Sequence, residues 1–165
     1  MSARAVGAKI SMIREYRADD LNAVIELIGR SVREIACLDY DPDQIEAWAP
    51  ALPDRQAWVQ RLATETVLVA ESESRLAGIA RLEQSGHVDL LYVHPQFQRR
   101  GIAAMLMETM IRLARKRGCR RLGTEASLTA RPFFAAQGFV VVAERVVERR
   151  GVRLRNLRME RIIVP

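Results

Sequence analysis

The stretch VDLLYVHPQFQRRGIA, residues 88–103, decides the fold that this chain is predicted to adopt. It begins with an apolar run that lacks helical spacing, and Pro95 interrupts the run, which indicates a buried strand ending near Val93. From Ile102 onward apolar residues recur at the spacing of one helical face, and Gly118 offers a C-terminal stop. The stretch therefore predicts a strand, a loop and an amphipathic helix in succession.

The loop and helix start at residues 98–103 have the properties of an anion site. Backbone N–H groups at a helix N-terminus have no intrahelical acceptor, so they suit a phosphate or pyrophosphate. Gly101 lets the backbone approach a ligand closely, and Arg99 and Arg100 add positive charge beside the amides. The alternative is an ordinary strand-to-helix turn with a solvated arginine pair, which this hexad alone does not exclude.

Two motifs give the chain a specific resemblance to a known family. Residues 98–103, QRRGIA, resemble the Q/R-x-x-G-x-G/A loop of the GNAT superfamily of N-acetyltransferases. LYVHP at 91–95 is similar to that family's fourth strand and its exit, and ARPFFAAQGF at 130–139 resembles its A-x-x-F-Y-x-x-x-G-F segment. The motifs stand in the family's order and separation, so the resemblance extends over essentially the whole chain.

The rest of the chain fits the architecture that this resemblance implies. The patterns predict strands at residues 9–16, 66–71, 76–82 and 121–127, helices from 20, 41 and 54, and a closing hairpin at 140–148 and 152–163. Asp19 or Asp20, Asp41 and Asp54 are the expected helix caps, and Asn156 marks an expected bulge. The fold class is α/β (α+β): one GNAT-like domain over residues 1–165, with a mixed, mostly antiparallel central sheet of about six or seven strands flanked by helices.

The resemblance implies transfer of an acetyl group from acetyl-CoA to an amine, and it assigns residues to the donor. The pyrophosphate is expected at residues 98–104, while the pantetheine arm pairs with the end of the strand at 88–93 and meets residues of the second motif. The expected donor-binding residues are Leu91, Tyr92, Val93, Gln98, Arg99, Arg100, Gly101, Ile102, Ala103, Ala104, Ser127, Ala130, Arg131 and Phe134. Neither the two cysteines nor the two histidines have the spacing of a metal site, so no metal is expected.

Catalysis requires a neutral amine and a way for the thiolate to leave. Glu83 is the first candidate base because strand alternation aims it at the cleft, with His87, Asp89 and Glu125 behind it; each carboxylate is alternatively a solvated charge. Phe134 stands where the family often has a tyrosine that protonates the thiolate. Tyr92, Ser127 or a water substitutes, or the thiolate leaves without an acid.

The segment between residues 40 and 58 is expected over the acceptor, because the corresponding part of the GNAT fold commonly overhangs that site. Tyr40, Trp48 and Trp58 would then line a substrate pocket. The alternative is that the two tryptophans pack in the core. The sequence does not identify the amine, which is a small molecule or a protein N-terminus or lysine.

Composition narrows the function classes. The chain carries a net charge of +6, but its arginines are spread among 20 acidic residues without interleaved aromatics, which argues against nucleic acid as the partner. No apolar run is long enough to cross a bilayer, and the N-terminus lacks the apolar core of a secretory signal, so a cytoplasmic protein is expected.

Two further expectations concern assembly and activity. The late strands present edges to a second subunit, and many GNAT-like proteins dimerise, so a homodimer is expected. The alternative to an enzyme is an acyl-CoA-binding sensor or scaffold of the same fold, in which Phe134 reflects weakened catalysis.

Overall fold

A seven-stranded sheet forms the centre of the molecule in the computed structural model, which describes residues 10–164 and the side chains from residue 12 onward. The strands are β1 (Ile10–Glu15), β2 (Thr66–Ser72), β3 (Arg75–Leu82), β4 (His87–Val93), β5 (Arg121–Ser127), β6 (Val140–Arg149) and β7 (Val152–Ile162). Their spatial order is β1-β2-β3-β4-β5-β7-β6, and every neighbouring pair is antiparallel except β4 and β5. This mixed, mostly antiparallel sheet confirms the predicted fold class. The predicted first strand began at Lys9, which lies outside the described residues.

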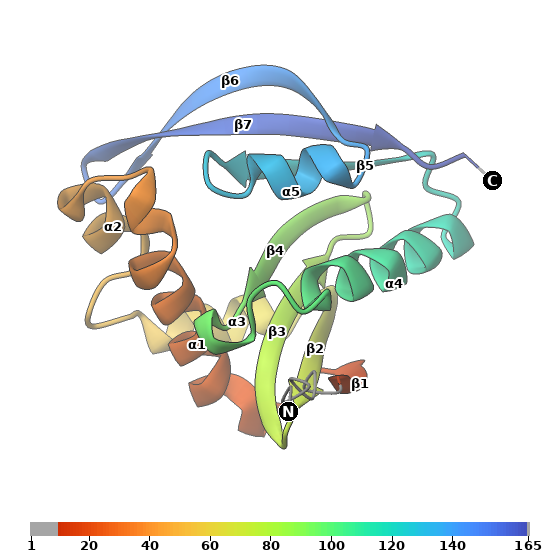
Figure 1. Ribbon diagram of the computed structural model, residues 1–165, viewed down its shortest axis with the longest axis horizontal. Helices are drawn as coiled ribbons and strands as arrows, with labels where there is room; N and C mark the ends of the chain where they lie inside the picture. The colour runs from red at the N-terminus through yellow and green to blue at the C-terminus, as the bar shows by residue number, and fades with distance from the viewer. Residues whose placement is uncertain (1–9, 165) are drawn as a thin grey trace, which may run out of the picture.

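Helices cover both faces of the sheet. They are α1 (Leu21–Glu34), α2 (Pro42–Trp48), α3 (Arg55–Leu62), α4 (Ile102–Lys116) and α5 (Arg131–Ala136), with short 3-10 turns at Ala18–Asp20, Ala36–Leu38 and Pro95–Phe97. Figure 1 shows α1 to α3 on one side of strands β2 to β4 and α4 on the other, with α5 beside β5 under the arch of β6 and β7. Within residues 10–164 no helix is long and apolar enough to span a membrane.

Two hydrophobic cores lie on the two faces. One packs α4 against the sheet through Leu106, Met107 and Met110, which are fully buried. The other packs α1 against the opposite face through Val24 and Leu27. Burying such side chains contributes about 1.5–3 kcal/mol each, so the two helices hold the sheet from both sides.

The helix starts confirm two of the three predicted caps. The Asp41 carboxylate accepts a hydrogen bond from the Gln44 amide at 2.8 Å, and that of Asp54 accepts from the Ala57 amide at 3.0 Å. The predicted cap of α1 was wrong. The carboxylate of Asp20 instead accepts from the Arg17 amide at 2.8 Å. A 3-10 turn, Ala18–Asp20, precedes the helix, and the Asp20 side chain caps this turn rather than α1.

The closing hairpin contains a second correction. The predicted bulge at Asn156 is absent, since that residue pairs regularly with Arg145 on β6 and Ser127 on β5. The alternation breaks there because β7 passes from one core to the other: Leu154 belongs to the core under α1, whereas Leu157 belongs to the core under α4. An irregularity occurs in β6 instead, between residues 141 and 143.

The parallel pairing of β4 with β5 is short. It consists of His87 with Gly123 and Val88 with Thr124, and the Thr124 hydroxyl donates to the Val88 carbonyl at 2.9 Å. Beyond this seam the two described strands form no further paired residues, although each continues to pair on its other side. The sheet therefore divides in its middle.

Candidate active site

A cavity of about 430 Å³ occupies the place where β4 and β5 diverge. Its walls bring together eight of the residues predicted to bind the donor: Leu91, Tyr92, Val93, Gln98, Ala103, Ser127, Ala130 and Phe134. Tyr40, Trp48 and Trp58, which were predicted to line a substrate pocket, also contribute to its walls. Residues from both motifs and from the segment between residues 40 and 58 thus meet around one space.

The loop before α4 is shaped by two hydrogen bonds and by positive φ angles at Arg99 and Gly101. The Gln98 side-chain amide donates to the Val93 carbonyl at 2.8 Å, which fixes the loop to the end of β4. Gly101 precedes the helix with φ +79°, a conformation that favours glycine. The Met105 amide donates to the Gly101 carbonyl at 3.0 Å, so the amides before residue 105 have no intrahelical acceptor.

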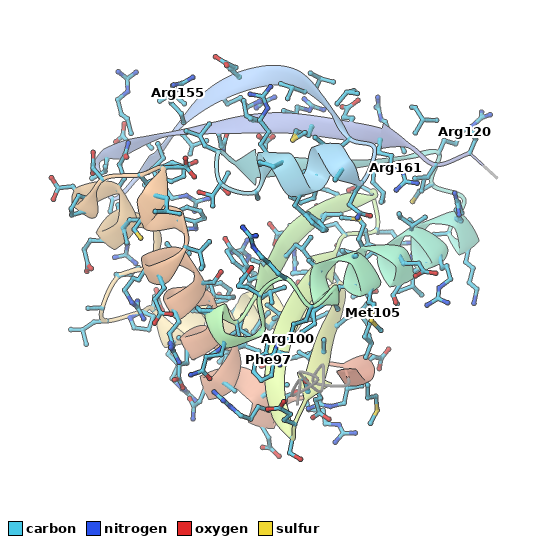
Figure 2. All side chains as sticks on the ribbon, viewed as in Figure 1. Phe97, Arg100, Met105, Arg120, Arg155 and Arg161 are labelled. Carbon is cyan, nitrogen blue, oxygen red and sulfur yellow. The ribbon has the colours of Figure 1, made fainter. Side chains whose placement is uncertain are left out.

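The surroundings of this helix start leave room for an anion. A side chain at Gly101 would meet no atom within 4 Å. Arg100 lies with its guanidinium 5.1 Å from the Phe97 ring centre and 3.8 Å from the Glu73 carboxylate, and Figure 2 shows Phe97 and Arg100 together near the start of α4. The exposed Arg99 has φ +59°. Amides and guanidinium groups therefore surround an open approach.

Some predicted donor-binding residues lie outside the cavity wall. Ile102 is buried in the core under α4, so only its backbone N–H is available to a ligand. Ala104 is half-buried on the helix, and Arg131 is exposed at the start of α5. None of these three residues is among those that line the cavity.

Tyr92 is the hydroxyl best placed to supply a proton in this cavity. Burial raises its pKa above the usual value, while Arg149 and Arg61 act in the opposite direction through their charges. The Trp48 indole N–H donates to the Tyr92 oxygen at 3.2 Å, which leaves the tyrosine's own proton free for another acceptor. The Ser127 hydroxyl accepts from the Ala130 amide at 3.0 Å and likewise retains its proton.

The candidate bases are distributed unequally. Glu83 follows β3, is half-buried and accepts from Arg81 at 3.3 Å; it is not among the described residues that line the cavity. Asp89 lines the cavity, but it binds Arg61 at 2.9 and 3.0 Å and Arg81 at 2.8 Å. Burial works to raise the pKa of Asp89, and these two guanidinium groups hold it below its usual value. A carboxylate so held is a weak base.

Two other titratable side chains of the cavity are less constrained. His87 and Glu125 both line it, from β4 and from β5. Glu125 has Arg145 at 3.8 Å as its ion-pair partner. Phe134, in contrast, is buried with its ring edge-on to Phe139 at 5.1 Å, so the family's usual tyrosine position carries no proton donor.

Asn156 and Arg149 line the cavity, although the sequence pattern did not predict either as a wall residue. The side-chain Oδ1 atom of Asn156 is buried without a hydrogen-bond partner, and Asn156 lines the cavity. A polar residue in an otherwise apolar alternation was the available signal, although it was interpreted as a bulge. Arg149 stood among many arginines, and only the folded hairpin distinguishes it.

Metal ligands do not gather in the described part of the chain. Across residues 10–164, no group of three or more histidine, cysteine, aspartate or glutamate side chains is arranged to hold a metal ion.

Comparison with known proteins gives consistent results. A family model described as an acetyltransferase (GNAT) domain matches residues 37–161. The uncharacterized N-acetyltransferase YafP of Escherichia coli (strain K12) is 35% identical over 148 residues, covering 89% of this chain and 93% of that protein.

Solved structures agree with this match. The GCN5-related N-acetyltransferase of Rhodopseudomonas palustris superposes with a TM-score of 0.90 and 30% identity, covering 94% of this chain and 97% of that one. PaiA N-acetyltransferase of Thermoplasma acidophilum, solved with coenzyme A, gives 0.75 at 18% identity, with 92% and 98% covered. YncA of Salmonella typhimurium, an acetyltransferase solved with acetyl-CoA, gives 0.67 at 22% identity, with 93% and 94% covered.

Proposed function

This chain belongs to the GNAT superfamily of N-acetyltransferases, and from that premise we propose that it moves an acetyl group from acetyl-CoA directly to a primary amine. The observation that carries the proposal is the divided sheet. Strands β4 and β5 separate after a short seam, and the cavity between them adjoins the free amides at the start of α4. An extended thioester donor fits such a space, with its phosphates at the helix.

The described residues suit acetyl-CoA, and one structural neighbour was solved with coenzyme A and another with acetyl-CoA. The helix-start amides of residues 102–104 and the guanidinium groups of Arg99 and Arg100 would hold the pyrophosphate. The edge of β4 that β5 leaves open would hydrogen-bond the amides of the pantetheine arm at Leu91 and Val93, as an added strand does, although the Val93 carbonyl already accepts from Gln98. Ser127, Ala130 and Phe134 would flank the arm from the other side.

The chemistry of the transfer divides among few residues. The Tyr92 hydroxyl keeps its proton at neutral pH and can donate it to the departing thiolate, with the Ser127 hydroxyl as a second donor. A backbone N–H near Val93 would polarise the thioester carbonyl. Glu83 lies outside the cavity wall, so it would accept the amine proton through water. His87 and Glu125 line the cavity and would accept this proton more directly.

A second function, an acyl-CoA-binding sensor or scaffold, is favoured by the missing hydroxyl at Phe134. The two functions differ in one product. An enzyme releases free thiol from acetyl-CoA in proportion to the amine acetylated, whereas a sensor binds acetyl-CoA and releases none. A panel of amines with continuous detection of thiol separates them.

The binding experiment uses matched substitutions at the two ends of α4. Gly101→Glu places a carboxylate at the helix start, and Gly118→Glu places one at the helix end; both glycines have positive φ and open space around them. We expect calorimetry to show that Gly101→Glu weakens acetyl-CoA binding at least tenfold, while Gly118→Glu changes it little. Equal binding by Gly101→Glu and the unsubstituted protein would refute the proposed phosphate site.

We also propose that the enzyme is a single cytoplasmic domain over residues 1–165 and a homodimer. The edge strand β6 supports the dimer, since Val140, Val142 and Val146 are exposed on it. Light scattering of the purified protein tests it, and a monomer at micromolar concentration would contradict it.

A further inference from the structure

A second cavity, of about 570 Å³, adjoins the one between β4 and β5. The two cavities share five wall residues: Ile28, Trp48, Trp58, Arg61 and Arg149. The second cavity lies among α1, the segment between α2 and α3, and the turn of the β6–β7 hairpin, on the sheet face opposite α4. An acceptor can therefore reach the cavity between β4 and β5 from the face that the phosphates do not use.

The walls of the second cavity carry more positive than negative charge. Four arginines line it, namely Arg33, Arg61, Arg149 and Arg150, against two carboxylates among the described residues, Glu26 and Asp54. One Asp54 oxygen already accepts the capping hydrogen bond of α3. A purely cationic acceptor would meet repulsion here, whereas an acceptor with an acidic group would be attracted.

Arg149 is the guanidinium best placed to bind such a group. It pairs in register with Val152 and lies two residues from Val147, and both valines pack against the core under α1. Since side chains alternate along a strand, Arg149 extends from the same inward face. The Arg149 side chain takes part in no ion pair or hydrogen bond with the described residues, whereas the Arg145 side chain on the same strand forms an ion pair with Glu125 at 3.8 Å.

Arg149 and Arg61 also act on the reacting end of the cavity. The charges of both oppose the rise that burial causes in the pKa of Tyr92, so both lie within electrostatic reach of its hydroxyl. Arg61 donates from its Nε and from one terminal nitrogen to the Asp89 carboxylate. The other terminal nitrogen of Arg61 has no hydrogen bond to the described residues. The available donors therefore lie near the Tyr92 hydroxyl, which would give its proton to the departing thiolate.

The remainder of this wall is aromatic. Trp48 and Trp58 face both cavities, and the Arg61 guanidinium lies 5.2 Å from the centre of the Trp58 ring. Flat apolar surfaces bind an apolar or aromatic side chain and leave the polar ends of a ligand to the arginines and Tyr92.

We propose that the acceptor is a small amine that also carries a carboxylate or a comparable acidic group, as an amino acid does, and that Arg149 binds this group while the amine faces Tyr92. This inference rests on the proposed acetyl transfer and specifies its substrate class. In the reaction the amine nitrogen bonds to the acetyl carbon, the carbon–sulfur bond breaks, and the nitrogen's proton passes to the base while the thiolate takes one from the acid.

The test compares three amines with the same side chain: phenylalanine, its carboxamide and phenethylamine. Initial rates of thiol release are measured at several pH values, because the three amines differ in the pKa of the ammonium group: replacing the carboxylate by a carboxamide lowers it, whereas phenethylamine lacks the electron-withdrawing group. We expect kcat/KM for phenylalanine to exceed that for the carboxamide by roughly ten- to a hundredfold, the range of a hydrogen bond to a charged group.

Two variants assign the preference to one residue. Arg149→Gln is expected to remove it, chiefly by raising KM for phenylalanine, and to leave acetyl-CoA binding intact. Arg153→Gln is the control: it removes the same charge from the same hairpin, but Arg153 pairs with Glu148 in register and so lies on the opposite face. It is expected to keep the preference.

Each outcome separates the substrate class from the proposed function. Equal use of acid and carboxamide, better use of an N-terminal peptide, or a preference that survives Arg149→Gln would overturn the inference and leave acetyl transfer standing. If no amine yields thiol, acetyl transfer is refuted, and the melting temperature of the protein with phenylalanine decides about the acid site. A rise in melting temperature that Arg149→Gln abolishes supports the acid site. If phenylalanine does not change the melting temperature, the acid site is refuted as well.

Discussion

Replacing Tyr40 by phenylalanine removes a single oxygen that connects three parts of the chain. The Tyr40 hydroxyl donates to the Arg155 carbonyl of β7 at 2.6 Å and accepts from the Leu128 amide, just after β5, at 3.0 Å. The ring itself is buried and lies edge-on to Trp48 at 5.3 Å. Tyr40→Phe keeps the ring and its packing, so the measured effect belongs to the hydroxyl.

The expected cost follows from these two hydrogen bonds. Each contributes about 1 kcal/mol net, and leaving the Leu128 amide without its acceptor adds about 1–3 kcal/mol if water is excluded. Leu128 is only half-buried, so water can partly replace the lost acceptor and the lower end of this range applies. We therefore expect a loss of about 3 kcal/mol, which lowers the melting temperature of a domain of this size by about 6–12 °C.

Urea unfolding followed by far-UV circular dichroism measures this free energy directly, with an unchanged m-value as the condition for comparison. Tyr16→Phe is the matched control, because the described residues provide no hydrogen-bond partner for the half-buried Tyr16 hydroxyl. It is expected to cost less than about 0.5 kcal/mol. If Tyr40→Phe costs no more than Tyr16→Phe, the hydroxyl does not connect β5 and β7 as described, and the reasoning is refuted.

Three further predictions concern the proton donor, the packing of α4 against β3 and the stability of the protein in acid. Tyr92→Phe should lower kcat by roughly ten- to a hundredfold, equally from about pH 6 to 9, since burial keeps the hydroxyl protonated over that range. Gly78→Ala should cost about 1–3 kcal/mol in urea unfolding and weaken acetyl-CoA binding, because its Cβ would lie 2.8 Å from the Ile102 side chain. Arg14 holds the pKa of Asp20 below its usual value, so the stability from this pair is fully present above about pH 3.9 and is lost as the pH falls further. In Arg14→Met the free energy of unfolding should therefore fall less steeply with decreasing pH.

Each of these predictions has its own control or contrary result. A kcat that Tyr92→Phe leaves unchanged would mean that the thiolate leaves without help from this hydroxyl. Gly29→Ala should stabilise the protein rather than weaken it, since the atoms nearest to the new Cβ belong to the flexible end of Arg33 and alanine favours the helix. An equally steep acid loss in Arg14→Met would mean that other carboxylates dominate it.

The order of the elements could be predicted from local patterns, since a strand, a turn residue and a helical face each leave a signal of short range. The caps at Asp41 and Asp54 were predictable for the same reason. Asp20 was not, because whether a carboxylate caps a helix or closes the preceding turn depends on one residue of offset. The passage of β7 between two cores was not predictable either, since a change of partner face and a bulge disturb the alternation identically.

The donor side of the site was more predictable than the acceptor side. The loop at residues 98–103 is proposed to act through backbone amides, and a glycine where φ is +79° is a local signal of such a helix start. The proposed acceptor side draws its wall residues from α1, α3, β4 and β6, which are distant in sequence. Arg149 differs from the other arginines only through its strand register and its lack of a described partner, and neither property is local.

The short seam between β4 and β5 has a consequence for the protein's lifetime in the cell. Two residue pairs join the halves of the sheet, so backbone groups beyond them are open to water, and we expect opening there to precede global unfolding. A ligand that binds the folded state adds stability with its concentration, by about 2.7 kcal/mol at a hundred times its dissociation constant. Degradation by proteases would then slow when acetyl-CoA is abundant and accelerate when it is scarce, so the amount of enzyme would follow its donor without any dedicated regulator.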